Sequence, residues 1–254
     1  MADISILAHL GAAAAAAGAG LVNAIAGGGT LISFPVLTAI GVPGVRANAT
    51  NSVALLPGYL GGVTAQRHDL AGLGRGLRLQ LVAAALGGLV GSILLVVTSE
   101  AVFRQIVPFL ILGACALLAG QDRLRARLFG AGTDHAEHIG AQVLSIGAAS
   151  TYGGYFGAGL GIMLLAILGL FSTLPINRLN AVKQLLSVVT SAASVAFLVF
   201  SGRVEWSLVA VMAPTSLIGG NLGGRLASRL PPKRLRAGVI VFGVVVALIY
   251  LSRL

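Results

Sequence analysis

Long apolar runs, separated by short polar or glycine-rich stretches, cover almost the whole chain. Ten of them can be distinguished, at residues 4–22, 28–42, 48–66, 77–98, 102–119, 138–156, 159–173, 180–201, 206–228 and 236–252. About 20 apolar residues are enough to cross the ~30 Å hydrocarbon core of a bilayer as an α-helix. The pattern therefore predicts an all-α polytopic membrane protein, with one transmembrane domain over residues 1–254.

Two of the runs, 28–42 and 159–173, are short and follow glycine clusters. About 15 helical residues extend only ~22 Å, which is less than the hydrocarbon thickness. We expect broken helices here, and whether they fully span stays open. Glycine breaks a helix where the chain turns tightly or approaches a ligand. Both explanations of the glycine clusters, a tight turn and a close approach to a ligand, stay open. The candidate site-lining backbone comprises Gly27, Gly28, Gly29, Gly157 and Gly159.

The two halves of the chain align without a gap when the sequence is shifted by 132 residues. The shift places Pro43, Arg46 and Asn48 on Pro175, Arg178 and Asn180, and it also pairs Gly87, Gly88 and Gly91 with Gly219, Gly220 and Gly223. Chance alignment of glycine is easy in this composition, but chance alignment of Pro-x-x-Arg-x-Asn is not. We predict repeat one at about 4–120, a connector at 121–137 and repeat two at about 138–252.

Five segments in each half would make the second repeat enter the membrane from the opposite side, as in many secondary transporters. Four or six segments in each half would make the repeats parallel instead. With ten crossings, thirteen Lys and Arg residues fall on one side of the membrane and four on the other. The basic side should be cytoplasmic, which places both termini on the outer side of the membrane.

Composition excludes several other classes of protein. Residues of the AVILMFWYC set make up 57% of the chain, whereas charged residues make up only 9%. The net charge of +10 is explained by the bias toward basic cytoplasmic loops, and no basic face with aromatic partners suggests nucleic-acid binding. No nucleotide loop, hydrolase elbow or zinc-protease motif occurs. We therefore expect no enzyme, no catalytic residue, no cofactor and no metal site.

The candidate chemistry lies in two matched polar clusters, each after a proline that closes a short segment. An arginine fork, asparagine amides and the free N–H groups of a helix start all suit a small anion. Lys183 is the strongest candidate for substrate binding, because a charged side chain inside an apolar membrane segment costs free energy and is usually functional or paired. The alternative is that the arginines anchor helix ends and the asparagines cap them. The candidate substrate-binding residues are Arg46, Asn48, Thr50, Asn51, Arg178, Asn180, Lys183 and Gln184.

These motifs resemble the sulfite exporter TauE/SafE family, also called the toluene-sulfonate uptake permease family. The first-half likeness lies in GGGTLISFP (Gly27 to Pro35) and GVPGVRANATN (Gly41 to Asn51). The second-half likeness lies in LNAVK (Leu179 to Lys183), GRVEW (Gly202 to Trp206) and GGNLGGRLA (Gly219 to Ala227). The resemblance runs from about Leu21 to Tyr250.

The resemblance implies a bacterial inner-membrane carrier for sulfite, sulfoacetate or other organosulfonates, with export in some relatives and uptake in others. It also implies site roles for Asn48, Thr50, Asn51, Arg178, Asn180 and Lys183.

The leading hypothesis is a secondary transporter that moves a small sulfur-containing or organic anion by alternating access. An anion channel on the same scaffold, or a carrier for a non-sulfur anion, is the alternative, and an intramembrane enzyme or assembly factor is a more distant one. The expected partners are the anionic substrate and the lipid bilayer. Proton coupling is possible, and the sequence leaves the oligomeric state open.

Overall fold

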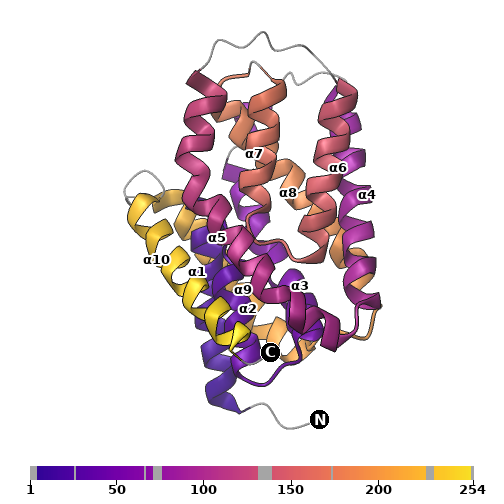
Figure 1. Cartoon of the computed structure of the whole chain (residues 1–254), viewed down its shortest axis with the longest axis vertical. Helices are drawn as coiled ribbons and strands as arrows, with labels where there is room; N and C mark the ends of the chain where they lie inside the picture. The colour runs from indigo at the N-terminus through magenta and orange to yellow at the C-terminus, as the bar shows by residue number, and fades with distance from the viewer. Residues whose placement is uncertain are drawn as a thin grey trace.

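The computed structural model describes residues 5–25, 27–65, 67–70, 76–130, 139–172, 174–226 and 232–252, and every structural statement below concerns these residues. They form ten α-helices and one short 3-10 helix, with no strand in this part of the chain. The elements are α1 (Ile6–Ile25), α2 (Thr30–Ala39), α3 (Gly44–Ala65), η1 (Arg67–Leu70), α4 (Gly76–Val97), α5 (Glu100–Gly130), α6 (Ile139–Tyr155), α7 (Leu160–Phe171), α8 (Ile176–Leu198), α9 (Trp206–Leu226) and α10 (Pro232–Leu251). The predicted all-α fold is confirmed (Figure 1).

Each predicted apolar segment corresponds to one helix, with two notable differences in length. Helix α3 begins at Gly44, so Arg46, which precedes the predicted segment 48–66, lies within the helix. Helix α5 continues through Gly130, where the sequence predicted a connector from residue 121, because the polar residues that follow Gly120 include good helix formers. Residues 131–137, the rest of that connector, lie outside the described residues.

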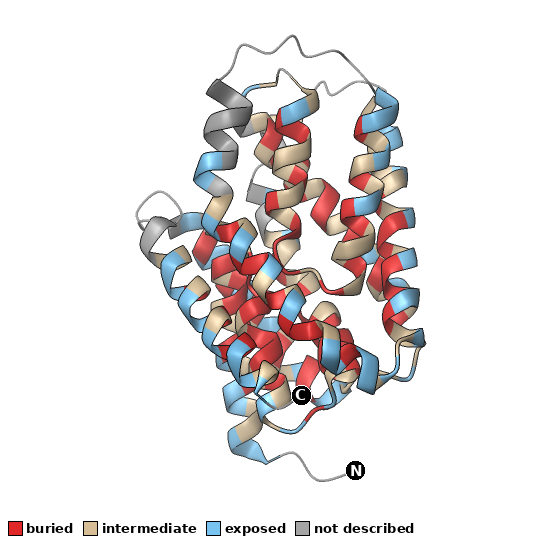
Figure 2. Ribbon diagram, in the orientation of Figure 1, coloured by how far each residue is buried: buried red, intermediate tan, exposed pale blue. Residues whose placement is uncertain are grey.

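Large apolar side chains cover much of the outer surface. Ile6 is 82% exposed, Leu144 75% and Phe200 87%, and exposed positions run along the outer helices in Figure 2. Four helical stretches are long and apolar enough to cross a membrane, namely Ile6–Ile25, Gly76–Val97, Glu100–Gly120 and Arg178–Leu198. A surface of this kind is suited to lipid rather than water, so the fold is that of a multi-pass membrane protein.

Glycines bring the long helices into close contact in two groups. In one group α9 packs on α1 and α3, and in the other α4 packs on α6 and α8 (Figure 1). A Cβ atom on Gly219 of α9 would collide with the carbonyl oxygen of Ala17, and one on Gly87 of α4 with that of Gly147. The 132-residue shift relates α4 to α9, α6 to α1 and α8 to α3, so the two groups contain elements that the shift matches. The inverted membrane orientation of the two halves stays a prediction.

Helices α3 and α8 run in opposite directions between two ends of the molecule. At one end, named here the Glu205 end, the start of α3 lies beside Glu100 and Glu205. At the other, the Asp69 end, the start of α8 lies beside η1, where the Arg178 Nε donates to the carbonyl oxygen of Asp69. A helix of 22 residues extends about 33 Å, so the two ends are a bilayer thickness apart.

The short helix α2 is held by aromatic side chains from three other segments. Phe34 packs edge-on against Phe103 of α5 and Phe156 of the α6–α7 connector, with ring centroids 6.1 and 5.5 Å apart. It also stacks on Tyr250 of α10, whose hydroxyl donates to Thr38 near the end of α2. Burial of these rings fixes α2 in the core although α2 is only 10 residues long.

Candidate functional site

The starts of α2 and α7 lie beside each other in the interior. A Cβ on Gly157 would lie 3.9 Å from the Thr30 hydroxyl, and one on Gly27 would lie 3.7 Å from Cγ1 of Ile162. From this point α2 leads toward the Glu205 end, where Thr38 bonds Tyr250, and α7 leads toward the Asp69 end, where Leu168 packs in one core cluster with Leu70. At 10 and 12 residues the two helices extend only about 15 and 18 Å, so neither spans a bilayer alone.

Glycines with positive φ make both interior turns. Gly27 and Gly28 have φ of 75° and 88°, and Gly157 and Gly159 have φ of 80° and 81°. Other residues rarely adopt this left-handed region without strain. Gly29 follows in the first turn, where its N–H donates to the Asn23 side chain at 2.6 Å. The structure thus places all five predicted glycines at the junction where α2 and α7 begin.

A small polar cavity adjoins this junction. Its volume is about 20 Å³, and α2, α3 and α8 contribute its polar lining, which comprises Thr30, Asn51, Ser52, Tyr59, Ser191 and Ser194. The sequence prediction missed Ser191 and Ser194. A signal was present, because Gln184, Ser187, Ser191 and Ser194 recur every three or four residues along α8 and so share one face. The 132-residue shift also relates the position of Tyr59 to that of Ser191, although the residue types differ.

Asn48 and Asn51 lie one turn apart on α3 and are almost completely buried, at 0% and 1% exposure. The Asn48 amide nitrogen donates to the carbonyl oxygen of Tyr155, the last residue of α6, at 2.6 Å. The Asn51 amide nitrogen lies 3.5 Å from the Thr30 hydroxyl. Within the described part of the chain, the side-chain oxygens of both residues have no hydrogen-bond partner.

Lys183 lies on α8 close to the start of α7. A Cβ on Gly161 would lie 3.7 Å from Cδ of Lys183, so the lysine stem packs against the first turn of α7. Among the described residues no carboxylate pairs with its ammonium group. Gln184 is 7% exposed, and Asn180 and Lys183 are half-buried on the same helix. Lys183 does not line the small polar cavity. It lies close to this cavity, because its stem packs on Gly161 and the preceding residue, Leu160, lines the cavity.

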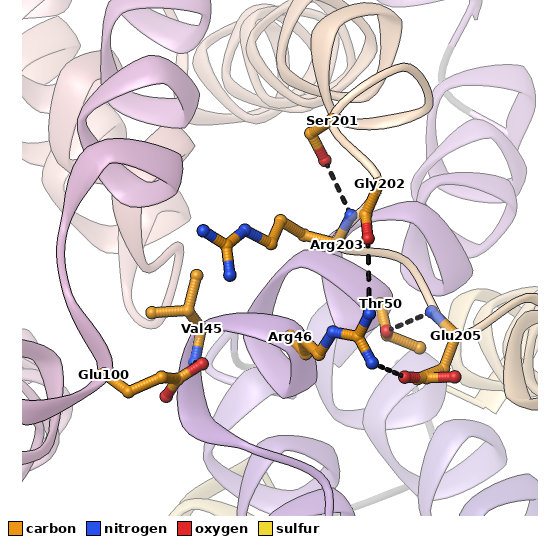
Figure 3. A network of polar contacts seen from close by, with 8 residues as sticks. All are labelled: Val45, Arg46, Thr50, Glu100, Ser201, Gly202, Arg203 and Glu205. Atoms are coloured by element: carbon orange, nitrogen blue, oxygen red, sulfur yellow. Dashed lines mark hydrogen bonds and ion pairs between the residues drawn. The ribbon is translucent and has the colours of Figure 1, made fainter. Parts of the chain in front are cut away.

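Arg46 and Thr50 lie at the Glu205 end instead of at the junction (Figure 3). The Arg46 guanidinium pairs with the Glu205 carboxylate at 2.6 Å and lies 3.5 Å from the Gly202 carbonyl oxygen. Thr50 accepts the backbone N–H of Glu205 at 2.9 Å. The Val45 N–H in the first turn of α3 donates to Glu100. A protein carboxylate therefore occupies the helix start where the sequence suggested an anion.

Arg178 has a corresponding position at the opposite end. Its Nε donates at 3.3 Å to the Asp69 carbonyl oxygen, in the segment that follows α3. Arg46 in turn approaches the Gly202 carbonyl oxygen, in the segment that follows α8. The two matched arginines thus join the start of one central helix to the segment after the other, once at each end. The structure brings Asn48, Asn51 and Lys183 close to the junction. It places Asn180 and Gln184 within one turn of Lys183 on α8, and it leaves Arg46, Thr50 and Arg178 at the ends.

Comparison with known proteins adds the family. The model of the sulfite exporter TauE/SafE family matches residues 12–250. The chain belongs to this family. Among curated TauE/SafE relatives, a "Probable membrane transporter protein" of Haemophilus influenzae is 29% identical over 88% of this chain and 86% of its own length. The "Probable membrane transporter protein YfcA" of Escherichia coli K12 is 24% identical over 90% of this chain and 84% of its own length.

A third relative, "Probable membrane transporter protein ORF9" of a Sinorhizobium species, is 25% identical over 91% of this chain and 87% of its own length. The family and the names of these relatives indicate a membrane transporter. They agree with the expectation of a transporter rather than an enzyme.

Proposed function

We propose that this TauE/SafE protein is a secondary carrier for a small sulfur-containing or organic anion, such as sulfite, sulfoacetate or another organosulfonate. It works by alternating access in the bacterial inner membrane, with both termini in the periplasm. The Glu205 end is then the periplasmic end, and the Asp69 end is the cytoplasmic one.

The observation that carries this proposal is the interior junction beside Lys183. The N-terminus of a helix has free N–H groups and a partial positive charge, which favour an anion. The broken helices of many transporters direct such termini at an anionic substrate near the middle of the membrane. Here α7 begins in the interior and the Lys183 stem packs on its first turn. Lys183 is half-buried, and no carboxylate of the described residues pairs with its ammonium group, so a bound anion would stabilise that charge.

We assign the substrate contacts to Lys183, Asn180, Gln184 and the backbone at the start of α7. Lys183 attracts the anion, and the two amide side chains orient its oxygens by hydrogen bonds. Arg46, Thr50 and Arg178 take a different role, in closing the two ends of the molecule. This division follows their partners, since Arg46 pairs with Glu205 and Arg178 donates to Asp69.

The volume of the polar cavity supports a carrier that must open to bind. About 20 Å³ of accessible space holds about one water molecule, which is less than a sulfonate needs. The helices around the junction must therefore move apart before a substrate enters. Release of the Arg46 contact at one end or the Arg178 contact at the other would expose the junction to one side at a time.

The test is charge movement by the purified protein in liposomes, measured by solid-supported membrane electrophysiology. Sulfite, sulfoacetate, taurine, sulfate and acetate are added in turn. We expect saturating transients for a sulfonated anion that are lost in Lys183→Ala and retained in Arg104→Ala. The control removes the same charge from an exposed position. Equal transients in wild type and Lys183→Ala would overturn the site, and currents linear in driving force would indicate a channel.

A further inference from the structure

Two buried oxygen atoms beside the junction lack the donor that their position requires. Asn48 and Asn51 are 0% and 1% exposed, and within the described residues neither side-chain oxygen has a hydrogen-bond partner. Leaving a buried polar atom unsatisfied costs about 1–3 kcal/mol. The orientation of the Asn48 amide is fixed, because its nitrogen donates to the Tyr155 carbonyl oxygen. Two such atoms one turn apart on α3 would be satisfied by a hydrogen-bond donor or by a cation.

Further oxygen atoms lie close to the Asn51 side chain. The Thr30 hydroxyl lies beside Asn51, and both residues line the small polar cavity. Helix α6 ends at Tyr155, whose carbonyl oxygen already accepts the Asn48 amide N–H. Oxygen ligands beside helix breaks coordinate Na⁺ in many transporters with broken helices.

The matched half of the chain supplies a positive charge at the corresponding position. The 132-residue shift relates Asn51 to Lys183 and Gly29 to Gly161. Lys183 packs on Gly161 at the start of α7, just as Asn51 reaches Thr30 at the start of α2. One half therefore has the ammonium group of Lys183 at the position where the other half has unpartnered oxygen atoms. A free cation bound by those oxygens would make the two halves electrostatically alike.

We propose that Asn48, Asn51 and Thr30 bind a monovalent cation of the size of Na⁺. On the proposed function this ion is the coupling ion that accompanies the anion. The ligands do not titrate near neutral pH, which excludes a proton at this position. The described residues contain no group of three His, Cys, Asp or Glu side chains, and hard divalent ions prefer carboxylates. Together with Lys183, the cation offsets the charge of an anionic substrate.

The test is thermal unfolding of the purified full-length protein in detergent, with NaCl exchanged for choline chloride at constant chloride. A ligand that binds only the folded state raises the unfolding midpoint, with a dependence on concentration that follows its Kd. We expect the midpoint to rise with Na⁺ in the wild type and in Asn221→Ala, a control that removes an exposed amide. The rise should disappear in Asn51→Ala.

Two further variants keep the test decisive if Asn51→Ala does not fold. Asn51→Asp retains the oxygens and adds a negative charge, so the same rise should occur at lower Na⁺ concentration. Asn51→Lys reproduces the second half, so its midpoint should no longer depend on Na⁺. No dependence on Na⁺ in the wild type, or the same dependence in Asn51→Lys, would overturn the cation site and leave an ordered water as the partner of the two oxygens.

The outcome separates this inference from the proposed function. Anion transients that depend on Lys183 but not on Na⁺ would retain the carrier and reject the coupling ion. A Na⁺-dependent midpoint without any anion transport would retain the cation site and reject the proposed substrate class.

Discussion

Three cationic side chains near the two polar clusters have different surroundings, and those surroundings separate their roles. Arg46 has a carboxylate partner 2.6 Å away, and Arg178 donates to a backbone carbonyl oxygen. Lys183 packs on the start of α7, and no described carboxylate pairs with it. A guanidinium that already has a carboxylate partner has little to gain from a substrate anion, whereas an ammonium without one has much to gain.

We predict that Arg46→Ala leaves the affinity for the transported anion unchanged, while Lys183→Ala weakens it. Hydrogen bonds to charged groups contribute about 1.5–3 kcal/mol, which corresponds to about tenfold or more in Kd. Isothermal titration of the purified variants measures both values. Glu205→Ala is the matched control, because it removes the other partner of the Arg46 ion pair. A similar loss of affinity in Arg46→Ala and Lys183→Ala would place Arg46 in the substrate site.

Sequence reasoning could identify Lys183 but not the partners of Arg46 and Thr50. A lysine within an apolar run is visible because its cost in a membrane is independent of the fold. Glu205 lies 159 residues from Arg46, and nothing local to either residue indicates that they pair. Asn48 and Thr50 were found as polar positions, but their contacts with Tyr155 and Glu205 depend on how distant helices pack.

At the scale of elements, the apolar runs predicted the helices well and their polar extensions poorly. The apolar run predicts a segment from residue 48, yet Glu100 satisfies the first-turn amide of Val45 and the helix begins at Gly44. Burial in a membrane dictates apolar runs, whereas helix ends depend on partners from elsewhere in the chain. The glycine clusters correctly marked the breaks before α2 and α7, because a turn with positive φ strongly favours glycine.

The close helix contacts predict which glycines tolerate a methyl group. A Cβ on Gly87 or Gly219 would collide with a backbone carbonyl oxygen, whereas one on Gly113 of α5 has nothing within 4 Å. We expect Gly87→Ala and Gly219→Ala to lower stability by about 1–3 kcal/mol, since overpacked contacts cost that much. Thermal unfolding in detergent measures the change, with Gly113→Ala as the control. Wild-type midpoints in both variants would show that these helices are less closely packed than the structure indicates.

At the scale of the whole molecule, each end holds an arginine contact that the 132-residue shift relates to the contact at the other end. Arg46 joins the start of α3 to the segment after α8, and Arg178 joins the start of α8 to the segment after α3. The junction of α2 and α7 lies between these ends, with its small polar cavity closed to a sulfonate. Alternating access therefore requires the two ends to open one after the other, with the substrate bound at the junction whichever end is open.

The measurement that tests this most directly is the reactivity of a cysteine at position 184 toward an impermeant thiol reagent. The protein has one cysteine, Cys115, so Gln184→Cys in a Cys115→Ala background gives a single reporter in α8. Ser252→Cys at the exposed end of α10 is the control for vesicle orientation. Alternating access at the junction predicts that position 184 is labelled from either side of the membrane and that the transported anion slows the labelling from both sides. Labelling from one side only, or labelling that the anion does not slow, would contradict it.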